Sequence, residues 1–196
     1  MVDEATRVAT ERGASNLTFQ IADLHAIGAP AGGFDVVHAH QVLQHVADPV
    51  GALRAMAALT SAEGIVAARD ADYSAMYWWP HEPMLDRWLE IYRGVTQHNG
   101  AECDAGRRLW HWAHDAGLRD VRHTTSTWTF ASAADLGWWC DLWADRIATS
   151  RLAEQAVAFG VATPDELVQI SSAWRAWGLR EHAVFVVPHG EIIARR

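Results

Sequence analysis

Short apolar runs and amphipathic stretches alternate along the first half of the chain. Apolar residues recur every three or four positions in Val2–Arg12, which predicts a helix that ends at Gly13. The segments Leu17–Ala22, Phe34–His40 and Gly64–Asp70 are short and mostly apolar, which is typical of β-strands. We therefore expect an initial helix and three strands in this half.

One helical pattern separates the second and third of these strands. Asp48 and Pro49 suit the N-cap and the first position of a helix, and the apolar period that follows runs to about Thr60. A strand, a helix and a strand at this spacing form a βαβ unit with two parallel strands. Phe34–His40 is apolar on both faces, as in a covered parallel strand. The pattern predicts an α/β fold.

The second half is richer in helical patterns. Its period predicts five helices, at Glu82–His98, Ala105–Ala116, Ser132–Ile147, Ser150–Phe159 and Thr163–Trp177. The alternating, Thr-rich segment Asp120–Phe130 predicts a strand, and Ala183–Ala194 predicts a closing strand. Pro188 interrupts this closing strand, and since proline lacks an N–H group we expect an edge strand or a bulge there.

Composition narrows the class of protein. The chain has 196 residues, half of them hydrophobic, which is enough for one domain with a substantial core. Its net charge of −8 disfavours a nucleic-acid partner. It has no apolar run of about 20 residues and no signal-peptide pattern, so we expect a soluble cytoplasmic protein without a membrane span. Its two cysteines lie far apart and indicate no disulfide framework.

Three histidines lie in or just after the second predicted strand. The alternation of a strand places His38 and His40 on the same side. With His45 they could supply three imidazoles to a metal-dependent hydrolase. No carboxylate or thiolate at a recognised spacing completes the ligand set, so we expect no metal. His38 is equally compatible with a strand-end histidine bonded to the backbone.

Three segments in order resemble class I S-adenosylmethionine-dependent methyltransferases, in particular the group related to ubiquinone and menaquinone biosynthesis. They are FQIADLHAI, GGFDVVHAHQVLQHVADPVGALRAM and GIVAARD. The resemblance implies a Rossmann-like sheet, S-adenosylmethionine as cofactor and methyl transfer to a small-molecule acceptor. It also implies one domain over residues 1–196, with a cofactor-side α/β part at 1–75, helices at 76–117, a strand at 118–131, a helical lid at 132–178 and a closing strand at 181–196.

The family also begins with a strand and a glycine-rich turn, and then a second strand, which this sequence lacks. We therefore expect a sheet without its first two strands, in a chain truncated at its N-terminus. Three arrangements would then be open: Leu17–Ala22 pairs directly with Phe34–His38, Leu17–Ala22 lies at an exposed edge, or another chain fills the gap. The third arrangement makes a homodimer a candidate assembly. The alternative function is a non-catalytic domain that binds an apolar ligand or a partner chain.

The resemblance places the cofactor after the first two of the three strands, at their carboxyl ends. It implies that Asp23 and Leu24 meet the adenine, because the family has an acidic or amide residue and an apolar neighbour there. It implies that His40 and Gln41 line the methionine end of the cofactor.

The acceptor side is expected after the third strand. The candidates for a catalytic base are His45, Asp70 and Tyr73. Trp78 and Trp79 follow the same strand and are the candidates for acceptor binding. The chain has eleven tryptophans, and those of the predicted lid either close over a flat acceptor or form the core of the lid itself.

Overall fold

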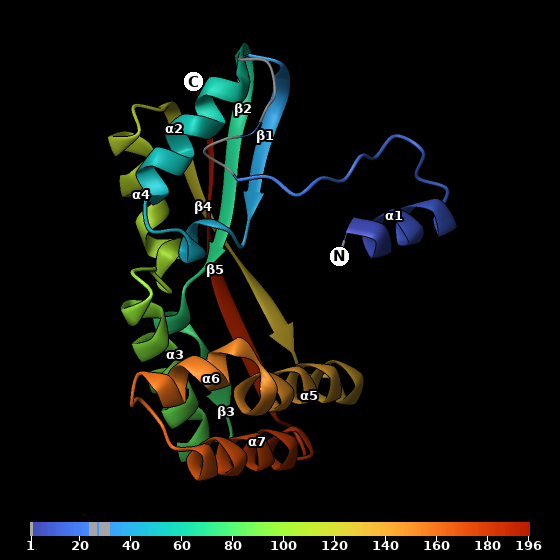
Figure 1. Ribbon diagram of the computed structural model, residues 1–196, viewed down its shortest axis with the longest axis vertical. Helices are drawn as coiled ribbons and strands as arrows, with labels where there is room; N and C mark the ends of the chain where they lie inside the picture. The colour runs from blue at the N-terminus through green and yellow to red at the C-terminus, as the bar shows by residue number, and fades with distance from the viewer. Residues whose placement is uncertain (1, 24–26, 28–31) are drawn as a thin grey trace.

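The protein, known from a computed structural model, combines one five-stranded sheet with helices (Figure 1). The structure describes residues 2–23, 27 and 32–196. The helices are α1 (Val2–Glu11), α2 (Pro49–Leu59), α3 (Pro83–His98), α4 (Ala105–Asp115), α5 (Ala133–Thr149), α6 (Arg151–Ala158) and α7 (Pro164–Gly178), with short 3-10 helices η2 (Leu43–His45) and η3 (Tyr73–Ala75). The strands are β1 (Phe34–His40), β2 (Thr60–Ala71), β3 (Tyr77–Trp79), β4 (Arg119–Phe130) and β5 (Val184–Arg195).

The predicted βαβ unit is confirmed. β1 and β2 are parallel, with Val37 opposite Val66, and α2 connects them. The N-cap is also confirmed, because the Asp48 carboxylate accepts the N–H of Gly51 at 2.8 Å. The other strand pairs are antiparallel, so the sheet is mixed. Along the described residues, no helix is long and apolar enough to cross a membrane.

The closing strand β5 is central, so the prediction of an edge strand is wrong. β5 pairs with β4 along one side and with β2 and then β3 along the other. Pro188 lies between the β5 residues that pair with β2 and those that pair with β3. There its carbonyl accepts the N–H of Asp72 at 3.0 Å. On this side of β5 neither β2 nor β3 pairs with Pro188, whereas β4 pairs with it through Thr127 on the other side. The sheet therefore tolerates a proline within its central strand.

Two predictions about the start of the chain are wrong. Leu17–Ala22 forms no strand, and its apolar side chains are exposed, with Ile21 86% accessible. β1 is an edge strand that pairs with β2, and most of its side chains are exposed rather than covered. Among the described residues no second strand pairs with the outer side of β1. β1 is therefore not covered on both sides, contrary to what its apolar sequence had indicated. α1 stands apart from the sheet in Figure 1.

The hydrophobic interior has two parts. The first lies where α2 and α4 cover one face of the sheet, and its most buried members are Leu43, Leu53, Met56, Val66 and Leu109. The second lies where α3, α5 and α7 pack against β5, and its fully buried aromatic members are Trp88, Trp143, Trp174, Trp177 and Phe185. Trp143, Trp174 and Trp177, which belong to the predicted lid, are therefore core residues. They make edge-to-face contacts with Trp88 or with each other, which is typical of aromatic packing.

The first turn of α4 lies directly against β5. A Cβ atom at Gly190 would lie 1.9 Å from the carbonyl oxygen of Gly106. A Cβ atom at Gly106 would lie 2.7 Å from the Gly190 nitrogen and 2.9 Å from the carbonyl oxygen of Asp70. The backbones approach too closely for a side chain at either position, so these glycines fix the distance between helix and sheet.

We expect Gly190→Ala to lower the free energy of unfolding by about 3 kcal/mol, because the added methyl group forces α4 away from the sheet. The measurement is the urea unfolding midpoint. Gly137→Ala on α5 is the matched control, because no atom lies within 4 Å of its added methyl group. That variant should gain about 0.5–1 kcal/mol through helix propensity. Equal midpoints for Gly190→Ala and the unmodified protein would contradict the close approach.

Candidate functional site

A cavity of about 560 Å³ lies at the carboxyl ends of the parallel strands β1 and β2. Its wall includes the turn after β1, the segment after β2, and one side of α5. Its lining includes Gln41, Gln44, His45, Tyr73, Tyr92, Trp128, Trp138, Trp139, Trp143 and Arg146. Ligands of open α/β sheets bind at this end of the strands, so this cavity is the candidate site.

Gln41 begins the turn after β1 in an unusual backbone conformation. Its φ is 57°, in the left-handed region that few non-glycine residues adopt. Its N–H donates to the Arg69 carbonyl at 2.8 Å, and its side-chain Oε1 accepts the Gln44 amide at 2.5 Å. Backbone strain of this kind is concentrated at ligand sites, where surrounding contacts hold it.

Asp70 holds this turn from behind. Its buried carboxylate, on β2, accepts the N–H groups of Leu43 at 3.3 Å and Gln44 at 3.1 Å. Burial raises the pKa of Asp70 to about 6, although the amide bonds act in the opposite direction. Asp70 is not part of the cavity lining, so its contacts are those of a support for η2.

His189 supports the same turn from β5, and the sequence had not singled it out. It is 1% exposed, and its Nε2 lies 2.7 Å from the Gln41 side-chain nitrogen, from which it accepts a hydrogen bond. Burial, together with the nearby Arg69, lowers the pKa of His189 to about 4, so the ring is neutral at pH 7. The sequence could not indicate this contact because the closing strand was expected at an edge.

His45 and Tyr73 both line the cavity. The His45 ring accepts a hydrogen bond from the Gln44 amide at 3.3 Å. Partial burial and the nearby Arg146 lower the pKa of His45, which favours the neutral imidazole. Tyr73 is buried and stacks on Tyr92 with ring centroids 4.2 Å apart, and burial raises its pKa, so the hydroxyl stays protonated.

His40 lies on the open face of the sheet and is not part of the cavity lining. Its Nε2 is 2.9 Å from Arg69 Nη1, and its pKa is lowered by burial and by that guanidinium. The ring of His38 stacks beside it at 6.1 Å, which confirms that both point to the same side. Within the described ranges, these two histidines and His45 do not form a metal-ligand group.

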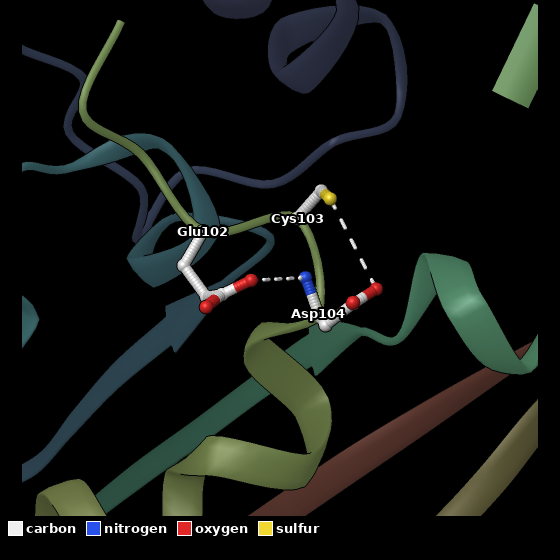
Figure 2. A group of neighbouring side chains, drawn as sticks. All are labelled: Glu102, Cys103 and Asp104. Atoms are coloured by element: carbon white, nitrogen blue, oxygen red, sulfur yellow. Dashed lines mark hydrogen bonds between the residues drawn. The ribbon is translucent and has the colours of Figure 1, made fainter. Parts of the chain in front are cut away.

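Glu102, Cys103 and Asp104, which Figure 2 shows, bring their ligand atoms within 4.8 Å of one another. The Asp104 carboxylate already accepts two hydrogen bonds from Ser74, one from its backbone N–H at 2.7 Å and one from its side-chain hydroxyl at 2.6 Å. Burial raises the pKa of Cys103 to about 11, so the thiol is protonated and a poor metal ligand. The cluster therefore anchors η3, and with it Tyr73, to the start of α4.

Trp78 and Trp79 lie on β3, away from the cavity lining. Trp78 stacks on Phe185 at 5.5 Å, and Trp79 is 66% exposed. Trp138, Trp139 and Trp143 of α5 line the cavity instead. Of the two residues expected at the adenine, Asp23 lies in an exposed segment, and Leu24 lies outside the described residues.

Comparisons with known proteins identify the family of this chain. Residues 1–130 match a family model described as a methyltransferase domain. The chain belongs to this family. An uncharacterized methyltransferase of Schizosaccharomyces pombe is 28% identical over 184 residues, which are 93% of this chain. The chain spans 65% of the length of that relative.

Solved structures show the same fold. The YcgJ protein from Bacillus subtilis has a TM-score of 0.57 and 15% identity, covering all of this chain and 78% of that one. A putative methyltransferase from Bacillus halodurans has a TM-score of 0.56 and 13% identity, covering 99% and 78%. A phosphoethanolamine N-methyltransferase of Haemonchus contortus, solved with S-adenosylhomocysteine, has a TM-score of 0.50 and 13% identity, covering 97% and 40%.

Asp70 and His189, the two buried groups behind the turn, change the stability of the fold with pH in opposite directions. The pKa of Asp70 is about 6, above its ordinary 3.8, so this group stabilises the fold as pH falls from 6 to 4. The pKa of His189 is about 4, below its ordinary 6.5, so this group destabilises the fold over the same range. In the unmodified protein the two contributions largely offset each other.

We expect Asp70→Asn to remove the stabilisation that Asp70 gives at low pH, so that the destabilisation by His189 is no longer offset. The variant should lose about 3 kcal/mol of stability between pH 6.5 and pH 4 beyond any loss in the unmodified protein, because it lacks the contribution of Asp70. Urea unfolding at pH 4.5, 5.5 and 7 measures this difference. Asp35→Asn, at an exposed position on β1, is the control. Parallel pH profiles for Asp70→Asn and the unmodified protein would contradict the argument.

Proposed function

We propose that this chain transfers a methyl group from S-adenosylmethionine to a small-molecule acceptor held in the cavity beside α5. The observation that carries the proposal is the position of the cavity. It lies at the carboxyl ends of β1 and β2, and it extends to an aromatic wall on α5. A donor bound against the strands and an acceptor bound against the helix would share one space, which is what group transfer requires.

The turn after β1 fits the methionine end of the cofactor. The Gln44 side-chain oxygen is buried and has no hydrogen-bond partner among the described residues. An ammonium group offers the donor that such an oxygen lacks. Gln41 would line the same end, whereas His40 lies outside the cavity and is no longer assigned to the cofactor. Asp23 and Leu24 remain the candidates for the adenine. S-adenosylmethionine supplies an electrophilic methyl group on a sulfonium sulfur.

The acceptor side is assigned to the lid rather than to Trp78 and Trp79. Trp138, Trp139 and Trp143 line the cavity on one side, and Tyr92 lines it as well. Flat aromatic walls with few polar groups are typical of sites for small organic ligands. This assignment keeps the expected function of the lid and moves the binding residues from β3 to α5.

The three candidate catalytic residues receive different roles in this proposal. His45 lines the cavity and has a lowered pKa. Its neutral ring could accept a proton from an O–H or N–H acceptor that replaces the Gln44 amide, now 3.3 Å from His45 Nε2. Tyr73 keeps its proton and would form part of the wall. Asp70 is a positioning residue that fixes the turn carrying Gln41 and His45.

We expect the protein to bind S-adenosylhomocysteine at one site with micromolar affinity, as measured by isothermal titration calorimetry. Gln41→Asn should weaken this binding about tenfold, because it withdraws the amide while asparagine tolerates the left-handed backbone. Gln97→Asn, at an exposed position of α3, is the control and should bind normally. A folded protein that binds no S-adenosylhomocysteine would contradict the proposal and favour the non-catalytic alternative.

We expect His45→Gln to lower kcat at least a hundredfold for an O–H acceptor while leaving S-adenosylhomocysteine affinity within twofold. The reason is that glutamine cannot accept the proton that the neutral imidazole accepts. The unmodified enzyme should lose activity below about pH 6.5, since protonation removes the base, and the midpoint should lie below 6.5 because the pKa of His45 is lowered. A variant with the same pH profile as the unmodified enzyme would exclude His45 as the base.

A further inference from the structure

Arg146 places a positive charge in the wall of the cavity. It lies on α5, and its guanidinium carbon is 5.4 Å from the centre of the Trp143 ring. The described residues that line the cavity include no aspartate or glutamate. Within the same part of the chain, no carboxylate forms an ion pair with Arg146, whereas Arg175 of α7 bonds Asp145 at 2.5 Å. The charge of Arg146 is therefore not neutralised locally.

This positive site belongs to an acidic protein. The net charge of the chain is −8, so an anionic ligand is repelled by most of the surface. The cavity has the opposite sign, and His45 adds no second charge at pH 7 because its pKa is lowered by partial burial and by Arg146 itself. A single fixed cation in such a cavity selects ligands with one negative charge.

Two buried tryptophans form part of the same wall. Trp139 and Trp143 both line the cavity, and both are more than nine-tenths buried. In the described part of the structure neither indole N–H has a hydrogen-bond partner. The indole N–H groups of Trp88 and Trp174, which do not line the cavity, also have no partner among the described residues, so the contribution of Trp139 and Trp143 to a ligand site lies in their rings. Their rings supply flat apolar surfaces beside the guanidinium.

We propose that the methyl acceptor is a flat aromatic carboxylic acid, whose carboxylate binds Arg146 while its ring packs against Trp139 and Trp143. An arginine matches the two oxygens of a carboxylate with paired N–H donors. That this ligand receives a methyl group rests on the proposed function. The anion site itself requires no methyl transfer, so it can be tested without the cofactor.

The test compares 2-naphthoate with 2-naphthamide, two bicyclic probes that differ in charge and little in shape. Each is titrated calorimetrically into the full chain without cofactor. We expect 2-naphthoate to bind at least tenfold more tightly. Arg146→Gln should abolish this preference and leave 2-naphthamide binding within twofold, and Arg146→Lys should retain part of the preference. Arg151→Gln, an exposed residue at the start of α6 that does not line the cavity, is the matched control.

Three outcomes would overturn the proposal: equal binding of the two probes to the unmodified protein, no binding of either, or unchanged 2-naphthoate binding in Arg146→Gln. A parallel titration of S-adenosylhomocysteine separates this inference from the proposed function. If Arg146→Gln weakens the binding of S-adenosylhomocysteine and not of 2-naphthoate, the arginine serves the cofactor and the acceptor inference is wrong. If 2-naphthoate binds as expected and S-adenosylhomocysteine does not bind, the anion site stands and methyl transfer is excluded.

Discussion

The turn after β1 depends on one buried carboxylate. Asp70 gives up contact with water and accepts the backbone N–H groups of Leu43 and Gln44 in its place. Those bonds begin η2 at a fixed position, which in turn holds Gln41 in its left-handed conformation. Since a buried carboxylate without donors is costly, neither the turn nor β2 can move without the other. The strand-side end of the cavity is therefore as rigid as the sheet.

The other end of the cavity belongs to a different part of the interior. Trp139 and Trp143 are members of the aromatic core of α3, α5 and α7, whereas Leu43 belongs to the core between α2, α4 and the sheet. The cavity thus lies where two packed regions meet, which is a common position for ligand sites. The proposed donor and acceptor sides would each be shaped by one of these regions.

Local sequence patterns predicted the helices, the βαβ unit and the cap at Asp48, because periodicity and capping are properties of a few neighbouring residues. They failed for Leu17–Ala22 and for Pro188, because only distant strands decide whether a segment is paired, at an edge or central. The residues of the candidate site divide in the same way, into those that local patterns indicate and those that distant elements supply. Gln41, His45 and Tyr73 reach the cavity because they follow strands, while His189 and Arg146 come from distant elements that no local pattern connects to it.

β5 belongs to both halves of the molecule. Its first residues pair with β3 beside the aromatic core, and its last residues pair with β2 beside the other core. Melting either half would remove the hydrogen-bonding partners of the half that remains. The two cores are thus coupled through one continuous strand, and the molecule should open to hydrogen exchange cooperatively rather than region by region.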